Sequence, residues 1–135
     1  MLANIRVKCP RCGEASNVRS VYDPCPKCQH PMGLLEQGSI YIYRQGSFYG
    51  IAGGFGLYIN NHPYGYIGNR ELLRIPVPYG TYNLHSAVGM NRKCRDLQVT
   101  ITPENPVVYT KVYMKPGFWT NSFVIEYMDP RLLNQ

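Results

Sequence analysis

Short apolar runs alternate with glycine- and proline-rich breaks along most of this chain. The alternation is clearest at Leu97, Val99 and Ile101, where Gln98 and Thr100 occupy the positions between them. A period of two places these apolar side chains on one face of a β-strand. The 11 prolines and 13 glycines interrupt the chain at intervals too short for long helices. The pattern therefore predicts a mostly-β protein.

The same pattern predicts about seven or eight short strands, a number typical of an antiparallel β-sandwich. A hairpin is expected where the turn-forming residues 61–65 separate two β-prone runs. Residues 72–77 are expected at a sheet edge, because a proline within the run removes a donor that a central strand needs. The other expected strands cover residues 39–44, 55–60, 66–68, 81–88, 97–101, 107–114 and 123–127.

The first 28 residues depart from this pattern, because they contain two copies of Cys-Pro-basic-Cys separated by 12 residues. Each pair places two sulfurs on one tight turn, and two such turns complete a tetrahedral thiolate site for one structural Zn²⁺. A four-cysteine site leaves no open position for water or substrate. We expect these ligands to be Cys9, Cys12, Cys25 and Cys28. His30 is a possible substitute, although a surface histidine beside a complete ligand set is the simpler interpretation.

Two other uses of cysteine are less compatible with the sequence. Disulfides need an oxidising compartment, and residues 1–6 lack the apolar core of a secretory signal, so we expect a cytoplasmic protein. A thioredoxin-like redox pair needs a βαβ context. The fifth cysteine, Cys94, lies among three cationic residues that would favour a reactive thiolate. A small, buried, unreactive side chain is the more common role of such a residue.

Composition divides the chain into a zinc ribbon with its linker, residues 1–37, and a β-sandwich, residues 38–135. The first part is too small to bury a sufficient core, so zinc is expected to supply much of its folding free energy. The formal net charge is +6. Residues 1–37 hold five Lys/Arg and three Asp/Glu and so contribute +2 of this charge. Four thiolates and one dication add about −2, which leaves the metal-loaded ribbon near neutrality and the whole chain near +4. No apolar stretch approaches the roughly 20 residues that a membrane-spanning helix needs.

Three stretches of the second part resemble a bacterial, lipoprotein-associated β-sandwich family of unknown function that is related to the PEGA domain. Residues 40–44 and 46–50 match the opening strand and its "YR…sF.G" signature. Residues 57–61 and 66–68 match the family's hairpin, and residues 77–84 match its strand–turn–strand. The resemblance implies a sandwich over most of residues 39–128 and brings no catalytic residues. It carries no lipoprotein role to this chain, which has a zinc ribbon and no lipid-attachment motif.

No nucleophile motif surrounds any of the three histidines, and eight carboxylates leave little material for acid–base catalysis, so we do not expect an enzyme. The leading hypothesis is a non-enzymatic protein-interaction module. The alternative is a nucleic-acid-binding ribbon, and the third is a carbohydrate- or cell-wall-binding sandwich. Candidate partner-binding residues are Tyr41, Tyr43, Arg44, Phe118 and Trp119. Candidate nucleic-acid-binding residues are Arg11, Arg19 and Lys27.

Overall fold

A computed structural model describes residues 3–20, 23–30, 37–45, 55–87, 93–115 and 122–131 of the chain. Within these residues the chain forms β-strands and turns, with one short 3₁₀ turn at residues 130–131, which confirms the mostly-β prediction. The strands are β1 (Asn4–Lys8), β2 (Ala15–Val18), β3 (Gly38–Arg44), β4 (Phe55–Ile59), β5 (His62–Ile67), β6 (Leu72–Val77), β7 (Gly80–Ala87), β8 (Lys93–Arg95), β9 (Leu97–Ile101), β10 (Val107–Lys115) and β11 (Ser122–Tyr127).

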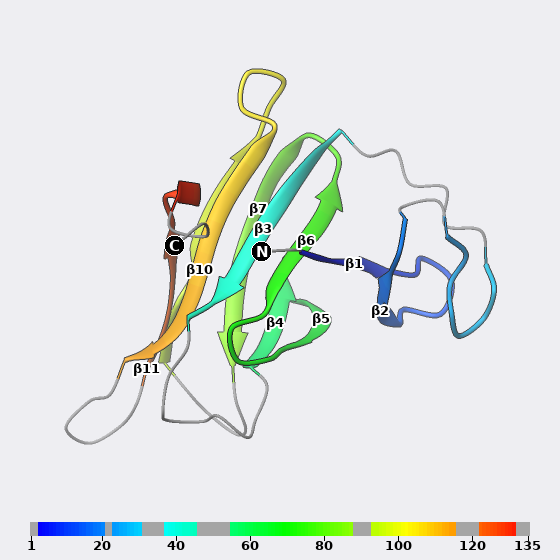
Figure 1. The fold of residues 1–135 in the computed structure, drawn as a ribbon, viewed down its shortest axis with the longest axis horizontal. Helices are drawn as coiled ribbons and strands as arrows, with labels where there is room; N and C mark the ends of the chain where they lie inside the picture. Colours follow the sequence, from blue (N-terminus) through cyan, green and yellow to red (C-terminus); the bar gives the residue numbers. More distant parts are fainter. Residues whose placement is uncertain are drawn as a thin grey trace.

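These strands form two stacked sheets, which Figure 1 shows with β1 and β2 extending to one side of β6. The first sheet has seven strands in the order β2-β1-β6-β3-β10-β11-β8, and the second has four in the order β5-β4-β7-β9. Alternating apolar side chains from both sheets fill the space between them, as in a β-sandwich. Fully buried members of this core include Ile40 and Ile42 from the first sheet and Leu57, Leu84 and Val99 from the second.

The first sheet is mixed, whereas the sequence pattern predicts a wholly antiparallel sandwich. β3 and β10 run parallel over six residue pairs, from Val107↔Ser39 to Val112↔Arg44. The turn between β9 and β10 carries the chain from one sheet to the other, so β10 pairs with a strand that is distant in sequence. Apolar alternation reports which face of a strand is buried but contains no information on the direction of its neighbour.

Strand β6 was expected at a sheet edge but lies between β1 and β3. Its pairing with β1 is parallel and covers only Leu73 and Arg74. Pro76 lies opposite Ser39 of β3 and beyond the end of the β1 pairing. The missing donor of Pro76 is therefore tolerated, because β6 is internal at its start, whereas among the described strands only β3 pairs with it at the proline.

The hairpin between β4 and β5 turns over two residues rather than the five that the sequence suggests. Asn60 and Asn61 both have positive φ values, of 52° and 68°, as the mirror-image turn of a tight hairpin requires. Asparagine adopts this left-handed conformation more readily than most residues. His62 and Pro63 consequently belong to β5 rather than to the turn.

Strand β1 joins the ribbon to the sandwich, and its two faces have different roles. Val7 packs with Cys9 and Cys25 in a small apolar cluster inside the ribbon. On the alternate positions, Arg6 and Lys8 reach β5 in the second sheet. The ribbon is therefore continuous with one sheet and hydrogen-bonded to the edge of the other.

Candidate metal centre

The first cysteine pair lies on a hydrogen-bonded turn that follows β1. The N–H of Cys9 donates to the carbonyl of Glu14 at 2.9 Å, and the N–H of Gly13 donates back to the carbonyl of Cys9 at 2.9 Å. Gly13 has a φ of +75°, a conformation that glycine adopts without steric cost. This turn brings Cys9 and Cys12 to one side of the loop.

The second pair repeats this turn 16 residues later. The N–H of Cys25 donates to the carbonyl of His30 at 3.0 Å, and the N–H of Gln29 donates to the carbonyl of Cys25 at 2.8 Å. Gln29 takes the place of the glycine and has a φ of 63°. The absence of glycine therefore leaves the hydrogen bonds intact but places a residue with a Cβ in the left-handed region.

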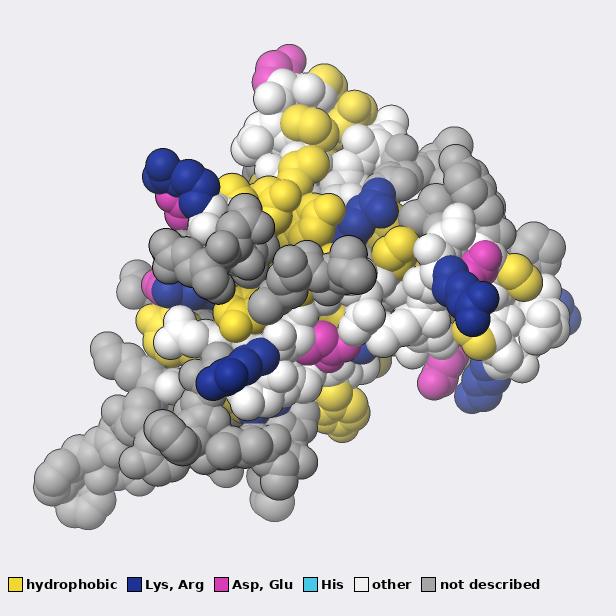
Figure 2. Space-filling model, in the orientation of Figure 1, with side chains coloured by type: hydrophobic (Ala, Val, Ile, Leu, Met, Phe, Trp, Pro, Cys, Tyr) yellow, Lys and Arg dark blue, Asp and Glu magenta, His cyan; other side chains and the backbone are white. Residues whose placement is uncertain are grey.

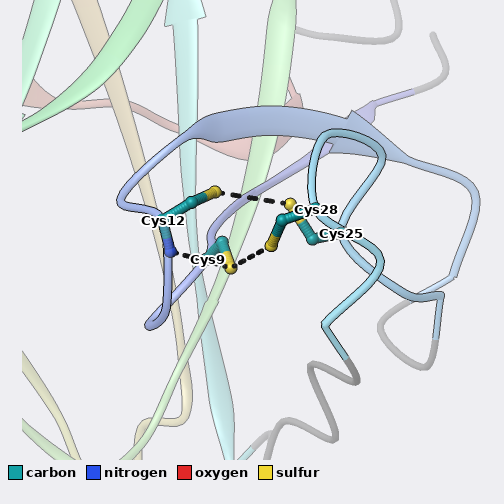
Figure 3. A group of neighbouring side chains, drawn as sticks. All are labelled: Cys9, Cys12, Cys25 and Cys28. Carbon is teal, nitrogen blue, oxygen red and sulfur yellow. Dashed lines mark hydrogen bonds between the residues drawn. The ribbon is translucent and has the colours of Figure 1, made fainter.

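The two turns bring all four sulfurs together, as Figure 3 shows. The four Sγ atoms lie within 4.8 Å of one another. The Cys9–Cys28 and Cys12–Cys25 Sγ distances are both 3.7 Å, so each close contact joins one turn to the other. Cys9 and Cys25 are buried, whereas Cys12 is exposed. This arrangement can hold one metal ion, and His30 contributes its backbone carbonyl to the second turn.

Backbone N–H groups prepare two of these sulfurs to carry negative charge. The N–H groups of Cys12 and Arg11 point at the Cys9 sulfur from 3.5 and 3.4 Å, and they lower the pKa of Cys9 to about 6. The N–H groups of Cys28 and Lys27 likewise lower the pKa of Cys25. Amide donors around a thiolate are typical of a cysteine that binds metal or reacts as a nucleophile.

Cys12 behaves in the opposite way. The N–H of Glu14 lowers its pKa, but desolvation and the neighbouring sulfurs outweigh that donor and raise the pKa to about 11. Sulfurs at such short distances cannot all ionise without a compensating positive charge. The cluster therefore suits a cation that replaces the remaining protons.

The basic residues of the ribbon are used in different ways. Arg11 and Arg19 are exposed. Lys27 is also exposed and pairs with Glu14 at 3.5 Å. On the face shown in Figure 2, Lys and Arg side chains are scattered among acidic and uncharged groups rather than gathered in one patch. The three candidate nucleic-acid residues are thus exposed, and the described side chains on the face of Figure 2 form no continuous basic patch.

The candidate partner-binding residues divide into three groups. Arg44 is fully buried, with its guanidinium 3.8 Å from the centre of the Phe55 ring and a 3.1 Å hydrogen bond to the carbonyl of Ile67. It is therefore a core residue and not a surface contact. Tyr41 and Tyr43 are half-buried on the opposite face of β3, where Tyr41 stacks on Tyr109 with ring centres 4.6 Å apart. Phe118 and Trp119 lie outside the described residues, as does the side chain of Cys94.

Arg6 and Lys8 are two residues whose importance the sequence analysis missed. Arg6 is 7% exposed and donates through one nitrogen to the carbonyls of Tyr64 and Tyr66, at 2.8 and 3.0 Å. Lys8 donates to the carbonyl of Pro63 at 2.8 Å. These bonds satisfy carbonyls on the outer edge of β5, which is otherwise an open edge. The alternation of basic and apolar residues along β1 predicts one buried face and one solvent-facing face, so no local signal in the sequence indicates that Arg6 and Lys8 contact β5.

Comparisons with known protein families, with curated proteins and with solved structures found no match to this chain. The resemblance to the PEGA-like family therefore stays a prediction. The described residues contain no helix with the length and hydropathy to cross a bilayer.

Proposed function

We propose that this chain is a zinc-binding, non-enzymatic module that recognises another protein. The observation that carries the zinc-binding, non-enzymatic part of the proposal is the set of four neighbouring cysteine sulfurs, with distances of 3.7 Å between the two turns. A tetrahedron with Zn–S bonds of about 2.3 Å has S···S edges of about 3.8 Å. Four protein ligands leave no position at which the metal would activate water or substrate, which favours a structural role.

Tetrahedral sulfur sites also accept iron, so the identity of the metal needs a direct test. Elemental analysis of the purified chain is expected to give one zinc per molecule, with no visible thiolate-to-iron absorption band. Cys12→Ser is expected to lose the metal, whereas Cys94→Ser, the matched control outside the two pairs, is expected to keep it. Iron in stoichiometric amount would contradict the zinc assignment but leave the structural role of the site in place.

Exposed tyrosines support a protein partner. Tyr66 on β5 is 69% exposed, and Tyr127 at the end of β11 is 57% exposed. Tyrosine is enriched in protein interfaces because its ring buries a large area at low entropic cost and its hydroxyl forms hydrogen bonds. Figure 2 also shows apolar side chains on the face that it presents.

The second candidate is nucleic-acid binding, favoured by the exposed Arg11 in the first cysteine turn and by the exposed Arg19 after β2. It is weakened by the other cations of the ribbon, because Arg6 and Lys8 bind carbonyls of β5 and Lys27 has a carboxylate partner. Carbohydrate binding by the tyrosines is less well supported, since Tyr41 already stacks on Tyr109.

Fluorescence anisotropy of labelled single- and double-stranded oligonucleotides, at low and physiological salt, separates the two leading candidates. The protein-interaction proposal predicts a flat curve at low salt. It also predicts that a protein partner, identified by cross-linking, binds with an affinity that changes little with salt. Tyr66→Ser should abolish binding of this partner, whereas Arg19→Gln should leave the binding unchanged. Salt-sensitive oligonucleotide binding that disappears with Arg11→Gln and Lys27→Gln would overturn it, because affinity that depends on phosphate contacts falls steeply with salt.

A further inference from the structure

The four sulfurs of the cysteine cluster differ in their access to solvent. Cys9 and Cys25 are buried, with 1% and 0% of their surface exposed. Cys28 is half-buried, whereas Cys12, which occupies the equivalent position of the first turn, is exposed. A reagent that comes from solvent therefore reaches the cluster first at Cys12.

Backbone amides add to the difference between the two sulfurs of the first turn. The N–H groups of Arg11 and Cys12 point at the Cys9 sulfur from 3.4 and 3.5 Å. The Cys12 sulfur has one such donor, the N–H of Glu14. A cysteine that binds a metal is deprotonated, and hydrogen bonds to its sulfur lower the nucleophilicity of the thiolate. Cys12 is therefore the more reactive thiolate of its turn as well as the more accessible one.

A second cysteine lies close enough to Cys12 to form a disulfide with it (Figure 3). The Cys12 and Cys25 sulfurs belong to different turns and are 3.7 Å apart. An S–S bond is about 2.05 Å long, so the two sulfurs need to approach by less than about 2 Å. A thiol at this distance can react with an oxidised cysteine before that cysteine is oxidised further.

We propose that Cys12 is a modification site for peroxides and that its oxidation joins the two turns through a Cys12–Cys25 disulfide. The Cys12 thiolate attacks one oxygen of hydrogen peroxide, the O–O bond breaks, and hydroxide leaves, which gives a sulfenic acid. The Cys25 thiolate then attacks the sulfenic sulfur, the S–O bond breaks, and a second hydroxide leaves. Two electrons pass from the two thiolates to the peroxide, and two protons from solvent convert both hydroxides to water.

This reaction changes what holds the ribbon together. It removes two of the four zinc ligands, so zinc is expected to leave the site. Cys9 and Cys28 remain as a second pair with the same 3.7 Å separation, and a second equivalent of peroxide would join them in the same way. Both disulfides would connect the two turns that the metal connects. The inference rests on the metal-binding part of the proposed function and is independent of the protein partner.

The first test is selective labelling of the full-length, zinc-loaded Cys94→Ser chain, in which every remaining cysteine belongs to the cluster. The zinc content is measured before any reagent is added. N-ethylmaleimide is then added in less than stoichiometric amount, and mass spectrometry of peptides locates the adduct. Cys12 should carry at least about five times as much label as Cys28, because reaction at cysteine follows thiolate character and exposure. This measurement leaves all four ligands in place.

The second test is oxidation of the same chain with one equivalent of hydrogen peroxide. Zinc should pass to a chromophoric chelator, and peptides analysed without reduction should contain the Cys12–Cys25 disulfide as the main product. Dimedone, which traps sulfenic acids, should form its adduct at Cys12. Cys25→Ser and Cys9→Ser are matched variants, because each removes one buried ligand. Cys25→Ser should accumulate the trapped sulfenic acid at Cys12, whereas Cys9→Ser should still form the disulfide.

Three results with the zinc-loaded chain would overturn the inference. The first is equal labelling of Cys12 and Cys28. The second is a main disulfide within one turn, such as Cys9–Cys12. The third is zinc that stays bound after peroxide treatment. Absence of zinc at the first measurement would instead contradict the metal-binding part of the proposed function, and with it the premise of this inference.

Discussion

At the scale of single residues, the two cysteine turns are a natural comparison between glycine and a residue with a Cβ. Gly13 and Gln29 occupy equivalent positions, form equivalent hydrogen bonds to Cys9 and Cys25, and have φ values of 75° and 63°. The left-handed conformation costs a residue with a Cβ roughly 1–2 kcal/mol. The second turn therefore contains strain that the first turn avoids.

Gln29→Gly is expected to stabilise the metal-bound ribbon by about 1 kcal/mol, because it removes that strain while the backbone bonds remain. Folding of the ribbon and metal binding are coupled, so zinc affinity should rise about fivefold. Competition with a chromophoric chelator measures the change. The control is Gly13→Ala, whose Cβ would meet nothing within 4 Å, so it should lower affinity by a similar factor through conformation alone. Unchanged affinity in Gln29→Gly would contradict the account.

The pKa values of the cysteines lead to a pH dependence. The pKa of Cys9 falls from 9.0 to about 6 in the folded cluster, so its ionisation stabilises the fold fully above pH 9 and this contribution is lost as pH falls through 6. The pKa of Cys12 is raised to about 11, so zinc must displace its proton throughout the neutral range. Apparent zinc affinity should therefore rise with pH and fall more steeply below pH 6, where Cys9 also takes a proton. Chelator competition across this range measures the slope, and a constant slope through pH 6 would contradict the assignment.

At the scale of elements, the contact of β1 with β5 depends on a glycine as much as on an arginine. Gly65 has a φ of +81°, and a Cβ at this position would lie 2.8 Å from the guanidinium of Arg6. Arg6 occupies that space to reach the carbonyls of Tyr64 and Tyr66. The position therefore needs glycine for two separate reasons, namely backbone conformation and the close approach of a side chain.

Gly65→Ala should lower the free energy of unfolding by about 3 kcal/mol, of which about 1 is conformational and the rest is the loss of the bonds from Arg6. In an Arg6→Gln background the same substitution should cost only about 1 kcal/mol, because the displaced guanidinium is absent. Denaturant unfolding of the four proteins in this double-mutant cycle measures the coupling. Equal costs of Gly65→Ala in the two backgrounds would show that Arg6 does not depend on the glycine.

The strands and the clustered cysteines are the features that the sequence predicts best, because both are encoded locally. Spacing alone identified the four cysteines that the structure brings together. Arg44 is the residue that was misread. It follows Ile40 and Ile42 at every second position of β3, which places its side chain on the buried face, whereas its charge suggests the surface. The parallel pairing of β3 with β10 had no local signal, because it joins segments that are distant in sequence.

At the scale of the whole molecule, the ribbon and the sandwich stabilise each other. The two metal-binding turns fix the end of β1, and β1 supplies the cations that cover the outer edge of β5. β1 also extends the first sheet through its pairing with β6. The cysteine cluster is therefore coupled to both sheets, although its four residues belong only to the ribbon.

Removal of the metal is expected to loosen β5 before it affects the centre of the sandwich. Without zinc the ribbon lacks a sufficient core of its own, so β1 should detach and expose the carbonyls that Arg6 and Lys8 satisfy. Hydrogen exchange of the chelator-treated chain should show a loss of protection of roughly tenfold or more at the amides that join β4 and β5, with little change in β3 and β10. Cys28→Ser should reproduce this pattern, and Cys94→Ser should not. Uniform loss of protection in every strand would mean that the sandwich cannot fold without the metal, whereas unchanged exchange in β5 would mean that the ribbon is only a separate appendage.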